Sequence, residues 1–193
     1  GTWTKPAGLA DVKIRVLGGG GGAGMAETSP GGSQQGGPGG GGGYAEEHLD
    51  APAVGATETV TVGAPGTGGY SPTWPPGAAG GTSSFGAFVS ASGGGGGTGA
   101  PSGTIGPGGA GGIGTGGQFN YGGQAGRRSD EGGPYSGYSP VAFKVAVGAV
   151  PGDNAGTNSG NGGIGRGKTP APPNPTHRGF SGSAGIVIVE EFS

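Results

Sequence analysis

The side chains best suited to binding chemistry lie in loops between glycine-rich stretches, at residues 70–76, 118–121 and 127–138. An aromatic ring in a Pro/Gly loop can stack on a sugar ring or anchor a protein partner, and aromatic and Arg side chains are the usual binding hot spots. The alternative is that these rings only cover the ends of a glycine-rich scaffold. We predict a binding surface that consists of Tyr70, Trp74, Phe119, Tyr121, Arg127, Arg128, Tyr135 and Tyr138.

A second motif, residues 162–169, fits the phosphate-binding loop pattern. That chemistry needs a buried strand before the loop and a helix after it, whose amides hold the phosphate. Here polar residues 158–161 precede the motif, and Pro170 follows it and prevents a helix. A chain this rich in glycine meets such a pattern by chance, so we predict no nucleotide site and no cofactor.

Titratable side chains are few and scattered. Glu46, Glu47 and Asp50 are close in sequence, but hydrolysis needs two carboxylates that flank a bond, and nothing here indicates a cleft. The two histidines, His48 and His177, lie far apart in sequence. We therefore expect a solvated strand edge at 46–50, no metal site and no enzyme.

The composition limits the class of protein. Of 193 residues 58 are Gly and none is Cys, the formal net charge is −2, and charged residues make up 10% of the chain. The near-neutral balance lacks the basic footprint of nucleic-acid binding, and no apolar run is long enough to span a bilayer. Residue 1 is Gly rather than Met, so we expect an excised or processed piece.

Strand patterns stand out near both ends. Residues 11–17 alternate strictly, with Val12, Ile14 and Val16 on one face, which is typical of a half-buried strand. The run 185–190 is continuously β-branched and suits a strand buried on both faces. Further strands are predicted at residues 3–4, 44–49, 57–62, 83–89 and 141–147. We expect the strands near the termini to pair in a small β layer.

Between the strands, glycine recurs every third residue. One phase contains Gly103, Gly106, Gly109 and Gly112, and another contains Gly108, Gly111, Gly114 and Gly117. Three residues per turn is the period of the left-handed polyproline II helix, and glycine lets such helices pack closely. Two bare faces suit a helix surrounded by neighbours, whereas collagen needs only one.

The predicted fold class is therefore mostly β and irregular. It combines a small β layer from the terminal strands with a bundle of left-handed polyglycine/polyproline II helices, and it contains no α-helix. We expect one domain over residues 1–193: strands with Gly runs at 1–92, the glycine bundle with its loops at 93–183, and a closing strand at 184–193.

The order of these elements resembles the glycine-rich domain at the ends of tail-fibre and minor tail proteins of bacteriophages, actinobacterial ones in particular. The landmarks are residues 1–8, the Gly runs at 18–22, 39–43 and 93–97, and the closing stretch 182–190. Residues 64–80 and 127–178 depart from the family in being richer in Pro and Tyr. The resemblance implies a virion tail component that contacts a bacterial surface receptor, a polysaccharide or an envelope protein. Its expected partners are other phage tail proteins and not nucleic acid, with a homotrimeric fibre as the expected carrier.

Two other classes of protein remain open. An ice-binding protein of the polyproline-bundle type should have a flat, regular face of small side chains. A structural glycine-rich protein of the cell wall should form insoluble assemblies without specific binding to a host.

Overall fold

The computed structural model describes residues 1–26, 36–70, 73–101, 104–127 and 179–193. The strand expected at 141–147 lies outside these residues. The described part is mostly strands and irregular chain, and its only helix is the 3-10 turn η1 (Ala51–Ala53). It contains no helix long and apolar enough to cross a membrane.

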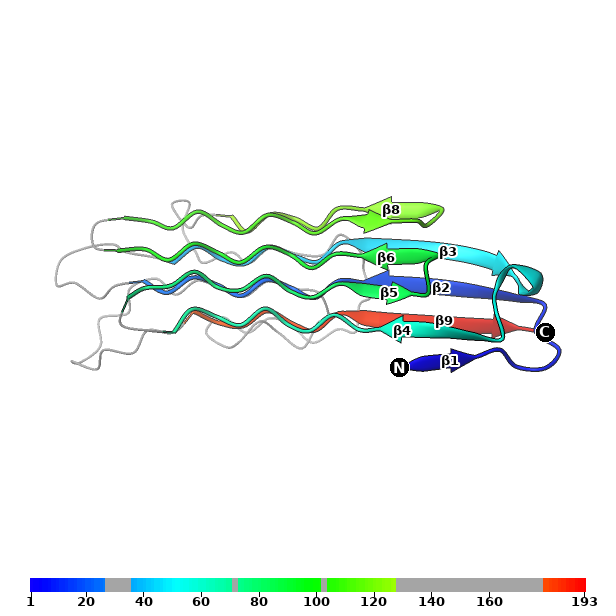
Figure 1. Cartoon of the computed structure of the whole chain (residues 1–193). Helices are drawn as coiled ribbons and strands as arrows, with labels where there is room; N and C mark the ends of the chain where they lie inside the picture. The colour runs from blue at the N-terminus through cyan, green and yellow to red at the C-terminus, as the bar shows by residue number, and fades with distance from the viewer. Residues whose placement is uncertain (27–35, 71–72, 102–103, 128–178) are drawn as a thin grey trace.

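The strands form two antiparallel sheets at one end of an elongated molecule (Figure 1). The five-stranded sheet has the order β1 (Thr2–Thr4), β4 (Thr57–Thr61), β5 (Ser83–Phe85), β6 (Val89–Ala91) and β7 (Gly114–Thr115). The four-stranded sheet has the order β8 (Phe119–Tyr121), β3 (Tyr44–Asp50), β2 (Asp11–Leu17) and β9 (Ile186–Phe192). Strands near the two termini pair as expected, because β2 lies beside β9.

The apolar core lies between the two sheets. Val12, Ile14 and Val16 of β2 are fully buried, as the alternation of 11–17 predicts. They pack against Phe85 and Val89 of the opposite sheet. Burying side chains of this size supplies about 1.5–3 kcal/mol each, so this small sandwich is the hydrophobic anchor of a chain otherwise poor in apolar side chains.

Two strand predictions need correction. Residues 83–89 form two strands, because Gly86 (φ 51°) turns the chain between β5 and β6. The run 186–192 is not buried on both faces: β9 is the edge strand of its sheet, and most of its residues are only half-buried. A β-branched run suits either position, and only the strand order distinguishes them.

Beyond the sandwich, glycine-rich segments continue both sheets as two layers of a rod. One layer consists of 63–69, 75–81, 92–100 and 106–113, in the order of β4, β5, β6 and β7. The other consists of 179–185, 18–25, 36–43 and 122–126, in the order of β9, β2, β3 and β8. The bundle therefore draws on glycine segments from the whole length of the chain and not from residues 93–183 alone.

Segment 18–25 shows how the layers are joined. Its successive amides donate to three neighbours in turn: Gly18 to Gly43, Gly19 to Gly81 and Gly20 to Ser183, at 2.8–3.0 Å. The sequence then repeats, with Gly21, Gly22 and Ala23 donating to Gly40, Ala78 and Phe180. Each residue thus directs its amide to the next neighbouring segment, and the residue three positions later returns to the same neighbour. This is the pattern expected of a helix with three residues per turn.

Burial follows the same period. In segment 106–113 the glycines at 106, 109 and 112 are buried, whereas Pro107, Ala110 and Ile113 are exposed. A methyl group on Gly109 would lie closer than 3.0 Å to backbone atoms of Gly95 and Gly96. Close backbone contact therefore explains the first glycine phase predicted from the sequence.

The second glycine phase has the same cause. A methyl group on Gly108 or Gly111 would meet the backbone of segment 122–126. Among the described glycines only Gly8, Gly86 and Gly116 have a φ in the left-handed region, and none of these lies in the bundle. The polyproline II conformation of these segments, in which φ is about −75°, and their left hand stay predictions.

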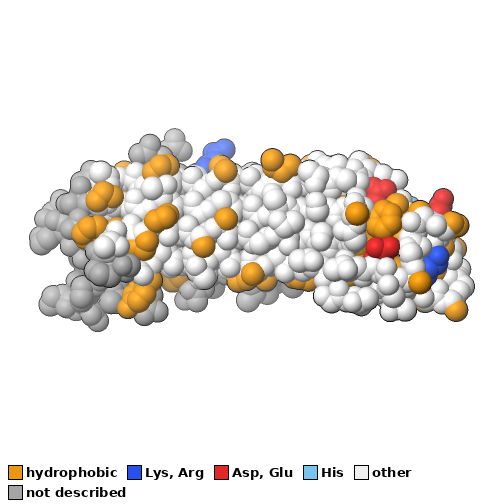
Figure 2. Space-filling view, in the orientation of Figure 1, with side chains coloured by type: hydrophobic (Ala, Val, Ile, Leu, Met, Phe, Trp, Pro, Cys, Tyr) orange, Lys and Arg blue, Asp and Glu red, His pale blue; other side chains and the backbone are white. Residues whose placement is uncertain are grey.

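The surface reflects this construction. In Figure 2 most charged side chains lie over the sandwich and one basic group lies over the rod, whose middle is mostly backbone with scattered small apolar groups. The sandwich carries the chain termini, and the glycine segments lead away from it (Figure 1).

Candidate functional site

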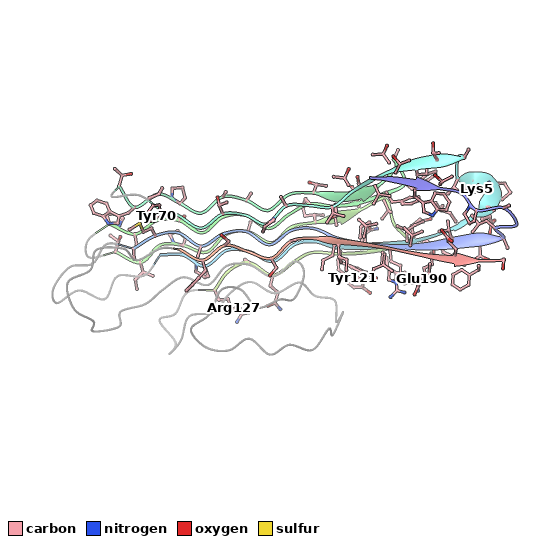
Figure 3. The ribbon with its side chains drawn as sticks, turned by 90° about the horizontal axis from the view of Figure 1, so that it is seen from below. Lys5, Tyr70, Tyr121, Arg127 and Glu190 are labelled. Carbon is pink, nitrogen blue, oxygen red and sulfur yellow. The ribbon has the colours of Figure 1, made fainter. Side chains whose placement is uncertain are left out.

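The predicted binding residues lie in two separate places. Tyr70 directly follows segment 63–69 and Trp74 directly precedes segment 75–81, at the end of the rod far from the sandwich. Figure 3 shows Tyr70 at that end and Lys5 at the other, with Tyr121 between them near the sandwich. We call the surface around Tyr70 and Trp74 the distal tip. Phe119 and Tyr121 belong instead to β8.

At the distal tip the backbone of Trp74 is strained. Its φ is 51°, the only positive value among the described non-glycine residues. A bulky residue in this region costs about 1–3 kcal/mol, and such strain clusters at functional sites. The surrounding chain holds it, since the Pro75 carbonyl accepts the Met25 amide at 3.2 Å and the Trp74 carbonyl lies close to Gly99.

The two rings of the distal tip differ in exposure. Tyr70 is 56% exposed, whereas Trp74 is half-buried. A partner can thus reach Tyr70 directly and the outer side of Trp74. Arg127 is exposed at the end of segment 122–126. Arg128, Tyr135 and Tyr138 lie outside the described residues.

Residues 118–121 are not the predicted loop, because β8 pairs with β3 over Phe119–Tyr121. The bend before β8 is held by Asn120, whose side chain accepts from the Gly117 amide at 3.1 Å and donates to the Gly117 carbonyl. Phe119 and Tyr121, two residues apart, share one face of the strand and are 55% and 50% exposed. Aromatic residues at alternate positions after Gly116–Gly117 were a hairpin signal that the loop assignment overlooked.

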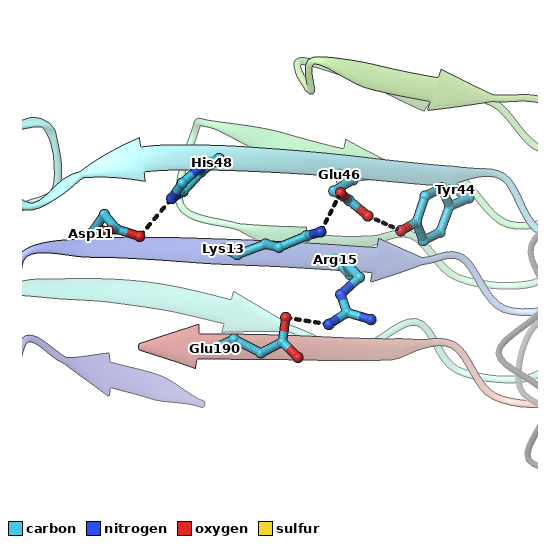
Figure 4. Close-up of polar contacts among 7 residues, drawn as sticks. All are labelled: Asp11, Lys13, Arg15, Tyr44, Glu46, His48 and Glu190. Carbon is cyan, nitrogen blue, oxygen red and sulfur yellow. Dashed lines mark hydrogen bonds and ion pairs between the residues drawn. The ribbon is translucent and has the colours of Figure 1, made fainter. Parts of the chain in front are cut away.

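Next to these rings the outer face of the four-stranded sheet carries a polar network that sequence reasoning missed (Figure 4). Glu46 binds Lys13 at 2.7 Å and accepts from the Tyr44 hydroxyl at 2.6 Å. Arg15 pairs with Glu190, and His48 contacts Asp11 at 2.6 Å. Strand register brings these groups together, since Arg15 lies opposite both Glu46 and residue 188.

The protonation of this network follows from its contacts. Burial alone would raise the pKa of Glu46, but hydrogen bonds from Lys13 and Tyr44 outweigh it and lower the pKa. The pKa of Tyr44 is raised, first by burial and then by its bond to the Glu46 carboxylate. Glu46 thus stays ionised and Tyr44 stays protonated at neutral pH, and both are engaged in joining strands.

The described residues bring no three His, Asp or Glu side chains close enough to hold a metal ion. The carboxylates expected at a solvated strand edge instead have partners: Glu46 in the network, and Glu47, whose side chain accepts from the Gln118 amide at 2.7 Å. What the geometry offers chemically is recognition: exposed aromatic rings at the distal tip and on β8.

Comparison with known proteins agrees with the architecture at the level of the family. A search of curated proteins found none that matches this sequence. The model of the glycine-rich domain family matches residues 1–191, nearly the whole chain. The bundle glycines lie where backbones pack against one another. By the match of the family model, the chain belongs to this family of glycine-rich domains.

Proposed function

We propose that this domain is a host-binding adhesin of a bacteriophage tail, located at the tail tip of the virion and acting at the bacterial surface. Its expected ligand is a cell-surface polysaccharide or an envelope protein. Its expected structural partners are other tail proteins, including a homotrimeric fibre that carries it. The order of sequence landmarks supports this proposal, together with the shape of the molecule.

One structural observation carries the argument. The two termini lie at the sandwich, whereas the described segments that end at residues 26, 70, 101 and 127 all lead toward the opposite end (Figure 1). A domain attached through its termini thus projects its distal tip outward. Recognition by chain reversals on a rigid scaffold is a common arrangement, and the bundle supplies the rigidity.

Within the proposal the distal tip is the receptor surface. Tyr70 offers an exposed ring, and the strain at Trp74 is held by its neighbours. Phe119 and Tyr121 lie near the sandwich, so one small receptor group cannot engage them together with Tyr70 (Figure 3). We assign them a lesser part in host binding.

The test is binding of the labelled chain to a panel of actinobacterial cells. We expect Tyr70→Ala and Trp74→Ala to lose about 2 kcal/mol or more of affinity, as truncated hot spots do. Ile113→Ala is the matched control, because Ile113 is 63% exposed on the side of the rod. If all variants bind cells equally, or if a variant loses binding only because it unfolds, the distal tip is not the receptor surface.

Ice binding is retained as a second candidate because of one observation. Pro76 and Ala79 on one segment, and Pro107 and Ala110 on another, are exposed at three-residue intervals. Regularly spaced small side chains on a rigid layer are what that class requires, and Figure 2 shows such groups on a mostly backbone surface. A thermal hysteresis assay distinguishes the two functions: activity without cell binding would favour ice, and insoluble assemblies without either would favour a structural role.

A further inference from the structure

At one side of the sandwich, the five-stranded sheet extends one strand further than the four-stranded sheet. The five-stranded sheet ends in β4 and β1, whereas the four-stranded sheet ends in β9, which packs against β5. β1 therefore lies beyond the last strand of the opposite sheet (Figure 1). The described residues place no strand beside the outer edge of β9.

The register identifies which backbone groups of β9 point to this open side. The Gly18 amide donates to Gly43 just past the β2–β3 ladder, so even-numbered residues of β2 bond β3. Because hydrogen-bonded pairs alternate along antiparallel strands, odd-numbered residues of β2 bond β9. These lie opposite Ile186, Ile188 and Glu190. The amides and carbonyls of Val187, Val189 and Glu191 are thus directed outward.

Among the described residues, the edge of β9 lacks most of the devices that usually protect an edge strand. Its first residues, Ile186–Val189, include no proline and no charge. Natural edge strands are normally shielded by charges, prolines, bulges or a covering element. Only at the other end does Trp3 reach across, with Nε1 donating to Glu191 Oε1 at 2.7 Å.

Trp3 also supplies an apolar wall for the open position. Its ring packs edge-on against Phe85, with centroids 5.4 Å apart, and remains half-buried. A strand added to β9 would have alternate side chains directed at this ring and at Val60, which is partly buried at the side of the core. The position thus combines backbone groups that have no partner among the described residues with an apolar surface on one side.

We propose that this edge accepts a single extended strand donated by another protein, which completes the four-stranded sheet opposite β1. Strand addition draws its affinity from main-chain hydrogen bonds and its specificity from alternate side chains. The donor should have small apolar residues at alternate positions facing Trp3. It should also have a basic residue near Glu191, whose carboxylate forms no ion pair among the described residues.

The stagger of the sheets explains why the occupant is a lone strand. If two copies joined β9 to β9, the projecting β1 of each would occupy the space needed by β4 of the other. A single donated strand brings no second sheet with it, so it avoids this collision. The inference does not depend on the host-binding proposal, since the site lies at the end of the rod that carries the termini.

The experiment uses the full chain with Trp74→Phe, which leaves Trp3 as the only tryptophan. The probe is a blocked synthetic peptide of alternating Val and Thr with a Lys at each end. We expect a saturable blue shift of Trp3 emission. We also expect slowed amide exchange at Val187 and Val189 but not at Ile188, whose amide already bonds β2.

Two proline variants sharpen the test. Val189→Pro removes an outward amide, a place where edge strands tolerate proline, and should weaken peptide binding about five- to tenfold. Thr4→Pro does the same on the free edge of β1 and should leave binding unchanged. No saturable shift at millimolar peptide, equal losses for both variants, or dimers of the chain formed through β9 would each overturn the proposal.

Discussion

Replacing one buried glycine of the bundle tests most directly how the rod is held together. The amide of Gly21, in the central segment 18–25, donates to Gly40 at 2.9 Å. A methyl group on Gly21 would lie closer than 3.0 Å to the carbonyl oxygens of Gly94 and Gly95. These are backbone atoms, so segment 92–100 would have to move as a unit.

The cost can be estimated from three terms. Overpacking of a close-packed interior costs about 1–3 kcal/mol. Moving segment 92–100 also weakens the bonds from Gly94 and Gly97 to segment 18–25, each worth about 1 kcal/mol. The reduced freedom of the unfolded chain returns about 0.4–1 kcal/mol. With both bonds lost, the sum of these terms lowers the free energy of unfolding of Gly21→Ala by about 2–4.5 kcal/mol.

The matched control is Gly122→Ala. A methyl group there meets nothing nearer than the Gly112 carbonyl oxygen at 3.7 Å. Only the unfolded-state term remains, so Gly122→Ala should be neutral or stabilise by up to about 1 kcal/mol. Its neighbour Gly123 lies in the outer segment 122–126 and faces the backbone of Gly41 and Gly42, and Gly123→Ala should fall between the two.

Urea unfolding followed by circular dichroism measures all three variants, with the midpoints compared at a common slope. The expected order of stability is Gly122→Ala, then Gly123→Ala, then Gly21→Ala. If Gly21→Ala unfolds within 0.5 kcal/mol of the parent, on the order of the scatter for surface substitutions, close backbone contact does not hold the bundle. Equal losses at Gly21 and Gly122 would contradict the same reasoning.

Three further predictions concern single side chains. Ser83→Ala removes a fully buried hydroxyl that bonds two backbone groups, one of them the Gly63 amide at 2.9 Å, and should cost about 1–3 kcal/mol in urea unfolding; Ser90→Ala, which loses an exposed hydroxyl, should change little. Because the pKa of Glu46 is lowered in the folded protein, its contribution is present above the ordinary carboxyl pKa of 4.5 and is lost as pH falls through the folded value. The stability difference between the parent and Glu46→Gln should therefore be constant near neutral pH and shrink in acid, and a difference that grows in acid would contradict this. Trp74→Gly should be more stable than Trp74→Ala by about 1 kcal/mol, because both lose the ring and only Ala keeps the strained φ; the opposite order in thermal unfolding would show that the strain is absent.

Several strands were predictable because their patterns are local. Strict alternation at 11–17 and 57–62 is typical of strands, and both stretches are strands in the structure, β2 and β4; one face is fully buried in β2 and only half-buried in β4. The glycine phases at 106–112 and 108–111 likewise indicated two faces in backbone contact, as found. In each case the spacing of residues matched one backbone geometry.

The candidate site was only partly predictable. Tyr70 and Trp74 were expected in a loop of a Pro/Gly-rich stretch, and they lie at one end of the rod; their part in binding stays a prediction. Phe119 and Tyr121 were misassigned to a loop because the hairpin signal, alternate aromatic residues after two glycines, covers only three residues. The network around Glu46 escaped notice because its members come from strands far apart in the chain and meet only through register.

Which residues can approach backbone to backbone follows from local spacing, because a glycine at every third position leaves no side chain to prevent it. The inner face of β2 follows likewise from its local pattern, since an apolar set at alternate positions can be buried in only one way. Tertiary structure alone decided the order of strands, the exposure of β9, and the continuation of each sheet into a layer of glycine segments. The reason is physical: glycine segments are nearly identical to one another, so their pairing is dictated by the sandwich strands to which each is joined and not by their own side chains.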